Sequence, residues 1–431
     1  MAFPKYETYK YSGVEWLGEI PSHWDLQNIR AVTELKCERN RPDLPVLSVY
    51  REYGVLLKDS RDDNHNATGL DISSYKVVEI GDLVINKMKA WQGSMGISDY
   101  QGIVSPAYII CRVKSEKIEP KFLHYLVRSK PYIGVYNALS YGVRVGQWDM
   151  HYEDLKKIGI PLPTSEEQQR IVAFLERTTA EIDEAIAKKQ RLIKLLQEQK
   201  AILINQAVTK GLNPKASMRD SGVEWFGEIP EHWATAKIKH IAKFYSGGTP
   251  SKEKSEFWDG DIPWVSPKDM KFRYIKDTED KITQKALKKT TIKLLDTNAV
   301  LIVVRGMILA RKIPVALTCF SVTINQDMKA LVLNVHCLPE YLVFLIEGVN
   351  KNLSTLLEES GHGTKTLPTE KLGAFVVPIP PKDEQVNIIN FIKENDAQTD
   401  SSIATINKQI LLLEEFRCNI IASAVTGKMK M

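Results

Sequence analysis

Two stretches of this chain read almost alike: residues 12–24 are SGVEWLGEIPSHW, and residues 221–233 are SGVEWFGEIPEHW, an offset of 209 positions (221 − 12). A second pair behaves in the same way, since residues 160–168 are IPLPTSEEQ and residues 377–385 are VPIPPKDEQ, an offset of 217 positions (377 − 160). Two copies of one unit in a single polypeptide predict an internal pseudo-two-fold. We therefore expect a function that two similar modules perform together.

The repeated segments flank two long stretches that do not repeat, about residues 25–155 and 234–370. A repeated frame with divergent inserts is typical of one fold that carries two different specificities. The alternative is a plainly duplicated domain whose loops have drifted, but the likeness stops and restarts in blocks. Both inserts mix β-branched strands with short helical segments, so the sequence predicts an α+β protein.

Composition narrows the class of protein. The chain has 431 residues, of which 43% are hydrophobic and 26% are charged, as in ordinary globular proteins of two or more domains. A net charge of +5 is compatible with nucleic acid but does not argue for it alone. The five cysteines show no C-x-x-C spacing, and the first residues do not resemble a signal peptide, so we expect the cytoplasm and no metal site. The apolar run 299–310 contains Arg305 and predicts one or two buried strands, without a membrane span.

Acidic residues after Thr164-Ser165 and after Lys382 predict two helix starts. Each start opens an amphipathic stretch of about ten residues, and a longer helix with a heptad seam is expected to follow. Glycines at 211 and 427 predict where the long helices end. The seam residues are Ile186, Ile193, Leu196, Leu203, Ile403, Ile406, Ile410, Leu413 and Ile420, with Lys200 and Arg417 at matching places.

Two such seams in one chain predict a pair of long antiparallel helices that form a coiled-coil spacer. The alternative is that each helix covers only its own domain. Residues 178–209 would give a rod of roughly 48 Å at about 1.5 Å per residue. One turn of duplex DNA is about 34–36 Å long, so this rod could hold two modules about one turn apart.

Polar, basic loops in both inserts are the candidate DNA contacts. Lysine and arginine neutralise phosphates, while asparagine, glutamine and arginine can read base edges. For any single one of these residues, the more common alternative is a solvated surface position that contacts no DNA. The candidates are Asn86, Lys87, Lys89, Gln92, Arg144, Gln147, Ser246, Thr249, Ser251, Lys252, Lys268, His362, Thr364 and Lys365.

Catalytic motifs are missing from the sequence. The nearest approach to an N-methyltransferase Asn/Asp-Pro-Pro-aromatic motif is SPAY at 105–108, and its third residue is wrong. There is no Gly-rich nucleotide fingerprint and no phosphate loop of the G-x-x-x-x-G-K-[ST] type. We expect a reader of DNA with no catalytic residue and no metal. His23 and His232 belong to the repeated frame, which favours a structural role for both.

Together, the paired SGVEW…GEIP…HW blocks and the paired IPLP/VPIP and EQ blocks resemble the specificity subunit of type I restriction–modification systems. The segments GDLV at 81–84 and SGGTP at 246–250 resemble those of the family's target recognition domains. The resemblance implies two target recognition domains separated by conserved spacer helices. The expected boundaries are 1–164 for the first recognition domain, 165–214 for the central spacer, 215–381 for the second recognition domain and 382–431 for the distal spacer.

The resemblance also implies the partners. These are double-stranded DNA with a bipartite, asymmetric site, two methylation subunits that modify adenine N6, and motor–nuclease restriction subunits, with no membrane involved. No cofactor is expected in this chain, because S-adenosylmethionine, ATP and Mg²⁺ would bind to partner subunits. The source would be bacterial or archaeal. Three alternatives remain: a self-sufficient enzyme with a diverged active site, a non-catalytic protein-interaction scaffold and a specificity module of another defence complex.

Overall fold

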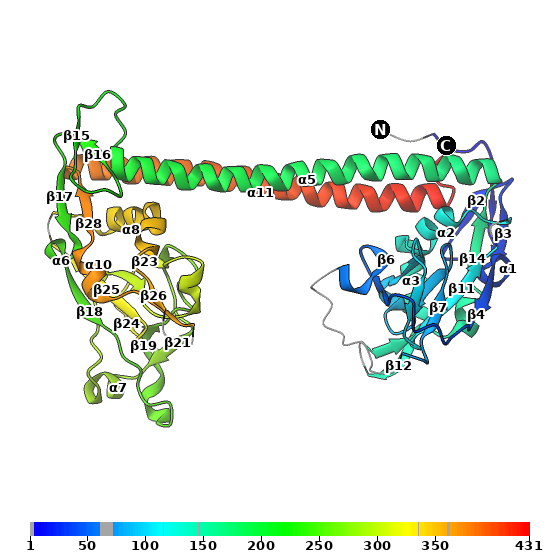
Figure 1. Ribbon diagram of the computed structural model, residues 1–431, viewed down its shortest axis with the longest axis horizontal. Helices are drawn as coiled ribbons and strands as arrows, with labels where there is room; N and C mark the ends of the chain where they lie inside the picture. The colour runs from blue at the N-terminus through cyan, green and yellow to red at the C-terminus, as the bar shows by residue number, and fades with distance from the viewer. Residues whose placement is uncertain (1–3, 61–71, 115, 145–146, 335, 360–362) are drawn as a thin grey trace. The chain divides into compact units, whose positions relative to one another are not determined.

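The computed structural model describes residues 4–60, 72–114, 116–144, 147–334, 336–359 and 363–431, without the side chains of residues 143, 144 and 147 (Figure 1). The chain divides into two compact units. Unit 1 comprises Met1–Lys189 and Asn407–Met431, and unit 2 comprises Gln190–Ile406. Each unit holds one β-rich domain together with a segment of both long helices. The boundaries expected from the sequence divide the chain into four consecutive segments, whereas unit 1 combines two separate segments. The expected boundaries therefore stay a prediction.

Unit 1 is built mainly of short antiparallel strands. Its strands are β1 (Tyr9–Tyr11), β2 (Glu19–Pro21), β3 (Asp25–Asn28), β4 (Thr33–Lys36), β5 (Leu47–Tyr50), β6 (Gly54–Leu57), β7 (Lys76–Val78), β8 (Leu83–Asn86), β9 (Met95–Ile97), β10 (Gly102–Val104), β11 (Tyr108–Val113), β12 (Tyr141–Arg144), β13 (Gln147–Asp149) and β14 (Gly159–Leu162). Its shorter helices are α1 (Ile29–Val32), α2 (Pro120–Val127), α3 (Lys130–Leu139) and α4 (Tyr152–Leu155), with 3-10 turns η1 (Lys58–Ser60) and η2 (Ala90–Gln92).

The centre of unit 1 is a four-stranded antiparallel sheet in the order β4-β11-β8-β9. The strand β14 returns to pair with β3, which joins the end of the domain to its beginning. Leu83 and Ile85 alternate with Val84 along β8, and all three are fully buried, because helices cover one face and strands the other. Phe122 and Leu126 of α2 pack into the same core as Leu83 and Ile85.

Unit 2 contains a comparable set of elements. Its strands are β15 (Met218–Asp220), β16 (Glu228–Pro230), β17 (Ala234–Lys237), β18 (Ala242–Ser246), β19 (Trp258–Val265), β20 (Tyr274–Ile275), β21 (Asp280–Ile282), β22 (Val300–Val303), β23 (Val315–Thr318), β24 (Thr323–Ile324), β25 (Met328–Leu333), β26 (Glu358–Glu359), β27 (Lys365–Thr366) and β28 (Val376–Ile379). Its shorter helices are α6 (Ile238–Ile241), α7 (Gln284–Lys289), α8 (Pro339–Gly348), α9 (Asn350–Ser354) and α10 (Thr369–Ala374), with η3 (Ser255–Phe257) and η4 (Met307–Ala310).

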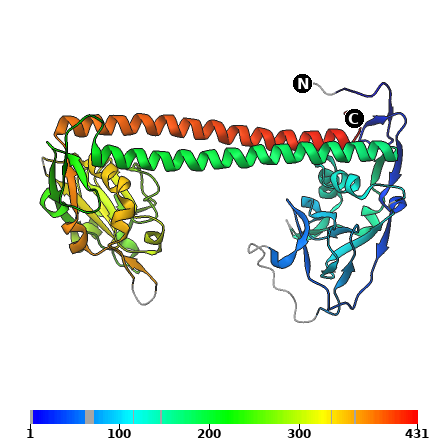
Figure 2. The ribbon, with the colours of Figure 1, turned by 45° about the horizontal axis from the view of Figure 1, so that its top comes forward.

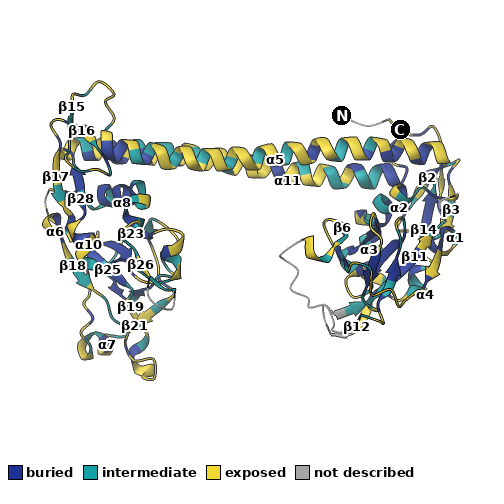
Figure 3. Cartoon of the chain, in the orientation of Figure 1, coloured by how far each residue is buried: buried dark blue, intermediate teal, exposed yellow. Residues whose placement is uncertain are grey.

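The core of unit 2 is a five-stranded sheet in the order β18-β25-β22-β23-β20. Its last pair, β20 with β23, is parallel, and the other pairs are antiparallel. All six residues from Tyr341 to Ile346 in α8 are buried, since this helix packs among the sheet, β28 and the long helices. Figure 3 shows how the buried residues gather inside each domain. Together the two units confirm a fold of mixed helix and sheet.

Two long helices complete the chain: α5 (Ser165–Lys210, 46 residues) and α11 (Lys382–Val425, 44 residues) (Figure 2). The predicted starts and ends are confirmed. The prediction of a short helix followed by a separate long one is wrong, because each segment is a single continuous helix. Neither helix contains a proline or a glycine, so nothing in the sequence breaks the hydrogen-bond ladder.

The β-branched strands and short helical segments expected in the inserts are also found, for example as β5, β7, β8 and α2. The run 299–310 forms one buried strand, β22, and not a second one. Gly306 has φ +136, which ends the extended backbone, and Met307–Ala310 then form the 3-10 turn η4. Over the described parts of the chain, helices with the length and apolarity to cross a bilayer are absent.

Candidate nucleic-acid interface

In unit 1 the two repeated blocks meet at the start of α5. His23 Nε2 lies 3.0 Å from Glu167 Oε2, and Trp24 Nε1 donates to Glu167 Oε1 at 3.4 Å. Burial alone would raise the pKa of Glu167, but the hydrogen bonds from His23 and Trp24 outweigh it and hold this pKa below its ordinary value. Gln168 accepts a hydrogen bond from Glu119 N and donates to Pro163 O. We call His23, Trp24, Glu167 and Gln168 the first junction.

Unit 2 repeats this arrangement residue for residue. His232 Nε2 lies 2.5 Å from Glu384 Oε1, and Trp233 Nε1 donates to Glu384 Oε2 at 2.9 Å. Gln385 accepts from Leu338 N and donates to Pro380 O. We call His232, Trp233, Glu384 and Gln385 the second junction. Both junctions join a β-rich domain to the first turn of a long helix, which supports the structural role expected for the two histidines.

The far end of a long helix also reaches each junction. In unit 1, Ala424 and Val425 of α11 are buried in the same core as Trp24. In unit 2, Ala207 and Val208 of α5 are buried in the same core as Trp233. The repeated blocks are therefore the places where each domain is fixed to both helices, which explains why they repeat while the inserts do not.

In the first domain, the predicted loop after β8 is a defined structure. Asn86 Oδ1 accepts from Met88 N at 3.2 Å, and the chain then forms η2, which ends at Gly93 with φ +86. Lys87 and Met150 are linked by a backbone hydrogen bond, so this loop lies beside the end of β13. Lys87 Nζ lies 3.9 Å from Asp149 Oδ2, whereas Lys89 is exposed.

A surface hollow of about 410 Å³ lies over this loop. Asn86, Lys89 and Gln92 line it, so three of the predicted contacts converge there. Ser105 and Tyr108 of the SPAY segment, which were not among the predicted DNA contacts, also line the hollow, and Asn86 Nδ2 donates to Tyr108 Oη at 3.4 Å. Amides, a lysine and hydroxyls around one opening are the groups that contact bases and phosphates.

The remaining first-domain candidates are Arg144 and Gln147. They belong to β12 and β13, whose backbones pair with each other, and their side chains lie outside the described residues. Trp91 and Trp148 contact each other edge to face with centroids 5.1 Å apart. This tryptophan pair joins the η2 loop to β13.

In the second domain, the candidate loop follows β18. Gly247 approaches the backbone of Ile324 and Asn325 so closely that a Cβ would overlap both carbonyl oxygens. Thr249 Oγ1 hydrogen-bonds to Gln326 Oε1, and the buried Trp264 donates to Gly248 O at 2.9 Å. The loop is thus held from two sides while Ser251 and Lys252 stay exposed. Gln326 is a further candidate, and its only sequence signal is a polar Asn-Gln pair between two apolar strands.

The other candidates of the second domain lie on separate elements. Lys329 Nζ donates to Ser246 Oγ at 2.6 Å. Lys268 lies 3.7 Å from Asp280, in an ion-pair cluster of its own. Thr364 and Lys365 precede and enter β27, and Lys365 O accepts from Gly306 N. His362 lies outside the described residues.

Comparison with known proteins identifies the family of this chain and solved structures with the same fold. The family described as "Type I restriction modification DNA specificity domain" matches residues 25–195 and 230–412. The chain is 29% identical over 323 residues to the EcoR124I/EcoR124II specificity subunit of Escherichia coli, covering 74% of this chain and 73% of that protein. It is 23% identical to the putative MjaX specificity subunit of Methanocaldococcus jannaschii over all of this chain and 99% of that protein.

Two solved structures share the fold. One comes from work on the assembly and conformational transition of the type I R-M system, with a TM-score of 0.70 and 17% identity over 94% of this chain and 98% of that one. The other is the HsdS subunit from Thermoanaerobacter tengcongensis, with a TM-score of 0.56 and 17% identity over 95% of this chain and 98% of that one.

Proposed function

Since the chain belongs to the type I restriction–modification DNA specificity family and is a DNA sequence-recognition subunit, we propose that each β-rich domain reads one half of a bipartite, asymmetric site. The observation that carries this proposal is the pair of matching junctions. Each junction attaches a β-rich domain to the long helices in the same way, although the two domains differ in sequence. Two domains that are attached in the same way but differ in sequence suit a protein that must recognise two different half-sites. Two weak readers on one frame also bind more tightly than either alone.

The spacer is an antiparallel coiled coil in this proposal. In unit 1, Arg417 donates to Asp183 at 2.6 Å and Lys189 donates to Gln409 at 2.7 Å. The residue numbers of the paired partners therefore rise along α5 while they fall along α11, as in an antiparallel pair. In unit 2, Lys200 pairs in the same sense with Asp400 at 3.0 Å and with Asp396. The predicted seam residues are all buried or half-buried, whereas Leu411 and Leu412 beside them are exposed. Alternation of this kind is what a heptad seam requires.

Two methylation subunits would bind to the exposed apolar faces of the helices. Leu192, Leu195 and Ile202 are exposed in unit 2, and Leu411, Leu412 and Phe416 are exposed in unit 1. Three large apolar side chains on one stretch of helix are typical of an interaction surface. One such surface per unit gives one methylation subunit per half-site, which this subunit would position for adenine N6 methylation. Restriction subunits would join the same complex.

The chemistry would belong to those partners. Within the described residues, no three His, Cys, Asp or Glu side chains gather as ligands of a metal ion would. We propose that S-adenosylmethionine binds to the methylation subunits, that ATP and Mg²⁺ bind to the restriction subunits, and that this chain is a non-catalytic component. Such a complex would act in the cytoplasm of a bacterium or archaeon. The comparisons do not favour the alternatives of a protein-interaction scaffold or of a specificity module from another defence complex.

Mapping of N6-methyladenine across the source genome tests the proposal. The expected result is one asymmetric motif with two short specified halves around a gap of fixed length, and its loss when the gene for this chain is deleted. A motif without a gap, or methylation that survives the deletion, would contradict the proposal.

A further inference from the structure

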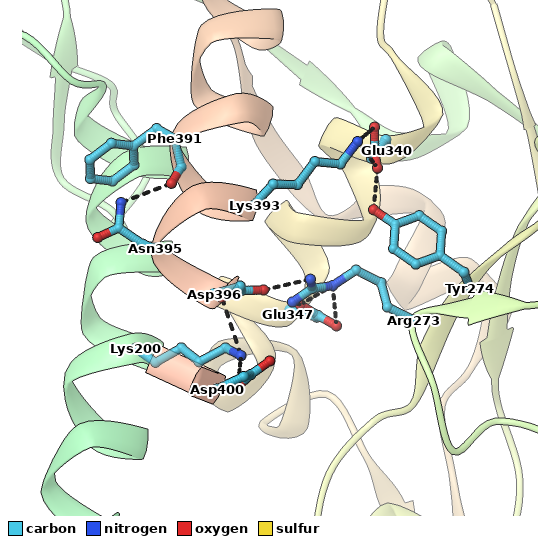
Figure 4. A network of polar contacts seen from close by, with 10 residues as sticks. All are labelled: Lys200, Arg273, Tyr274, Glu340, Glu347, Phe391, Lys393, Asn395, Asp396 and Asp400. Carbon is cyan, nitrogen blue, oxygen red and sulfur yellow. Dashed lines mark hydrogen bonds and ion pairs between the residues drawn. The ribbon is translucent and has the colours of Figure 1, made fainter. Parts of the chain in front are cut away.

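A network of charged side chains joins the second β-rich domain to both long helices within unit 2 (Figure 4). Arg273 precedes β20, and Glu340 and Glu347 belong to α8. The helix α11 supplies three further members and α5 supplies one. The charged members are Lys200, Arg273, Glu340, Glu347, Lys393, Asp396 and Asp400.

Arg273 is at the centre of this network. Its Nε and Nη2 donate to Glu347 Oε2 at 3.0 and 2.7 Å, and its Nη1 donates to Asp396 Oδ2 at 2.6 Å. The guanidinium carbon lies 4.4 Å from the ring centroid of Phe344. One planar group therefore binds a carboxylate of the domain, a carboxylate of α11 and an aromatic face, which only arginine can do.

Asp396 carries the connection to the second helix. Its Oδ1 lies 3.3 Å from Lys200 Nζ of α5, while its Oδ2 accepts from Arg273. The side chains of Arg273 and Asp396 are only 18% and 10% exposed, so water screens this pair weakly. Lys393 of α11 adds a parallel link, with Nζ 2.7 Å from Glu340 Oε1.

Unit 1 has different residues at the matching places. The helices α2 and α8 both begin at a proline, Pro120 and Pro339, which aligns Arg128 with Glu347. The repeat offset of 217 positions aligns Thr179 with Asp396. Thus unit 1 has an arginine and a threonine where unit 2 has two carboxylates, and the Arg273 network cannot form there.

A polar hollow of about 440 Å³ occupies this place in unit 1. Arg128, Thr179, Asp183 and Arg417 are among the residues that line it. Arg128 donates instead to the backbone oxygens of Met95, Arg51 and Glu52, all within its own domain. A direct side-chain link from α2 to α5 is the pair of Lys121 with Glu176, whose side chains are 57% and 46% exposed.

We propose that Arg273 is a positioning residue that holds the second recognition domain in one orientation on α5 and α11, through contacts that have no counterpart in unit 1. This inference rests on the proposed function. If both domains must meet their half-sites at once, a domain that can reorient accepts a half-site displaced by one base pair, about 3.4 Å along the duplex. Arg273 would then restrict the gap that the complex accepts.

The test uses the full chain assembled with its methylation subunits. Methylation rates are measured on duplexes that carry the natural site or the same site with its gap one base pair longer or shorter. The first variant is Arg273→Lys, which keeps the charge but cannot bind both carboxylates in the same geometry. The second is Arg273→Met combined with Glu347→Gln. The matched control is Lys121→Met, which removes the exposed link in unit 1.

For both Arg273 variants we expect the preference for the natural gap to fall about tenfold, equivalent to about 1.4 kcal/mol, and for the control to change it by less than about twofold. An unchanged preference in an assembled Arg273→Lys complex overturns the inference. So does failure of that variant to assemble, because Arg273 would then be needed for folding itself. A wild-type complex without any gap preference instead overturns the bipartite reading on which the inference rests.

Discussion

Gly427 lies against Trp24 at the first junction, so closely that a Cβ on Gly427 would be 3.0 Å from Cζ3 of the indole and closer still to the ring of Pro21. Its φ of +74 belongs to the left-handed region. Gly211 repeats this relationship at the second junction, where a Cβ on Gly211 would be 3.0 Å from Cζ2 of Trp233. A glycine thus follows each long helix at a place where a tryptophan of the frame leaves little room for a side chain.

Gly427→Ala should therefore lower the free energy of unfolding by about 2 kcal/mol, since both the backbone conformation and the contact oppose a Cβ. Denaturant titration of the complex or of the isolated chain measures it. Gly134→Ala is the control, because Gly134 lies in α3 with nothing within 4 Å of its Cβ position, and alanine there should be neutral or stabilise by about 0.5–1 kcal/mol. Equal effects of the two substitutions would contradict the packing argument.

The junction carboxylates predict a pH dependence. The pKa of Glu167 is held below its ordinary value of 4.5, chiefly by His23 and Trp24 acting against the effect of burial. A depressed pKa contributes stability above the unfolded value, and this contribution is lost as the pH falls through the folded value. Glu167→Gln should therefore lower the melting temperature at neutral pH, and its difference from wild type should shrink as the pH falls below about 4.5.

Thermal melts between neutral and acid pH check this prediction. Glu184→Gln serves as the control: Glu184 also has a lowered pKa, through the hydrogen bond from Lys188, but it is fully exposed, so little change in melting temperature is expected at any pH. A pH-independent difference between Glu167→Gln and wild type would mean that the junction is held by packing alone.

The junctions also show what the sequence could and could not predict. Local signals place the helix ends correctly, because an acidic first turn and a terminal glycine act within a few residues. The contact of His23 and Trp24 with Glu167 joins residues 144 and 143 positions apart, and no local rule predicts it. Its one signal is that both partners recur together in the second copy. Arg273 has no such signal, since its contacts exist in one copy only.

The two faces of α11 should respond differently to substitution. Ile410 is 9% exposed in the predicted seam, while its neighbour Leu411 is 64% exposed. Ile410→Ala should cost about 2 kcal/mol of unfolding free energy, near the lower end for a buried isoleucine. Leu411→Ala should leave unfolding unchanged and weaken assembly with the methylation subunits, measured by titration of the subunits. If Leu411→Ala leaves assembly unchanged, the partner surface lies elsewhere.

Lys89 offers a test of the first-domain loop. Its side chain is exposed at the rim of the 410 Å³ hollow, where it can reach a phosphate without breaking an ion pair. Lys89→Ala should weaken binding to all duplexes alike and reduce the slope of log affinity against log salt by about 1. Lys156→Ala is a suitable control, because Lys156 is paired with Glu153 and lies outside the hollow. An unchanged salt slope for Lys89→Ala would remove this residue from the DNA contacts.

Exchange of residues 25–155 for the matching insert of another family member should change one half-site and leave the other half intact. The exchange leaves Glu167 and α5 in place, and the new β3 can pair with the resident β14 because their ladder consists of backbone hydrogen bonds. The reciprocal exchange of residues 234–370 should change only the other half. Methylome mapping of cells that carry each hybrid reads both halves at once. A change in both halves after one exchange would mean that the domains do not read independently, whereas a change in neither would place recognition outside the inserts.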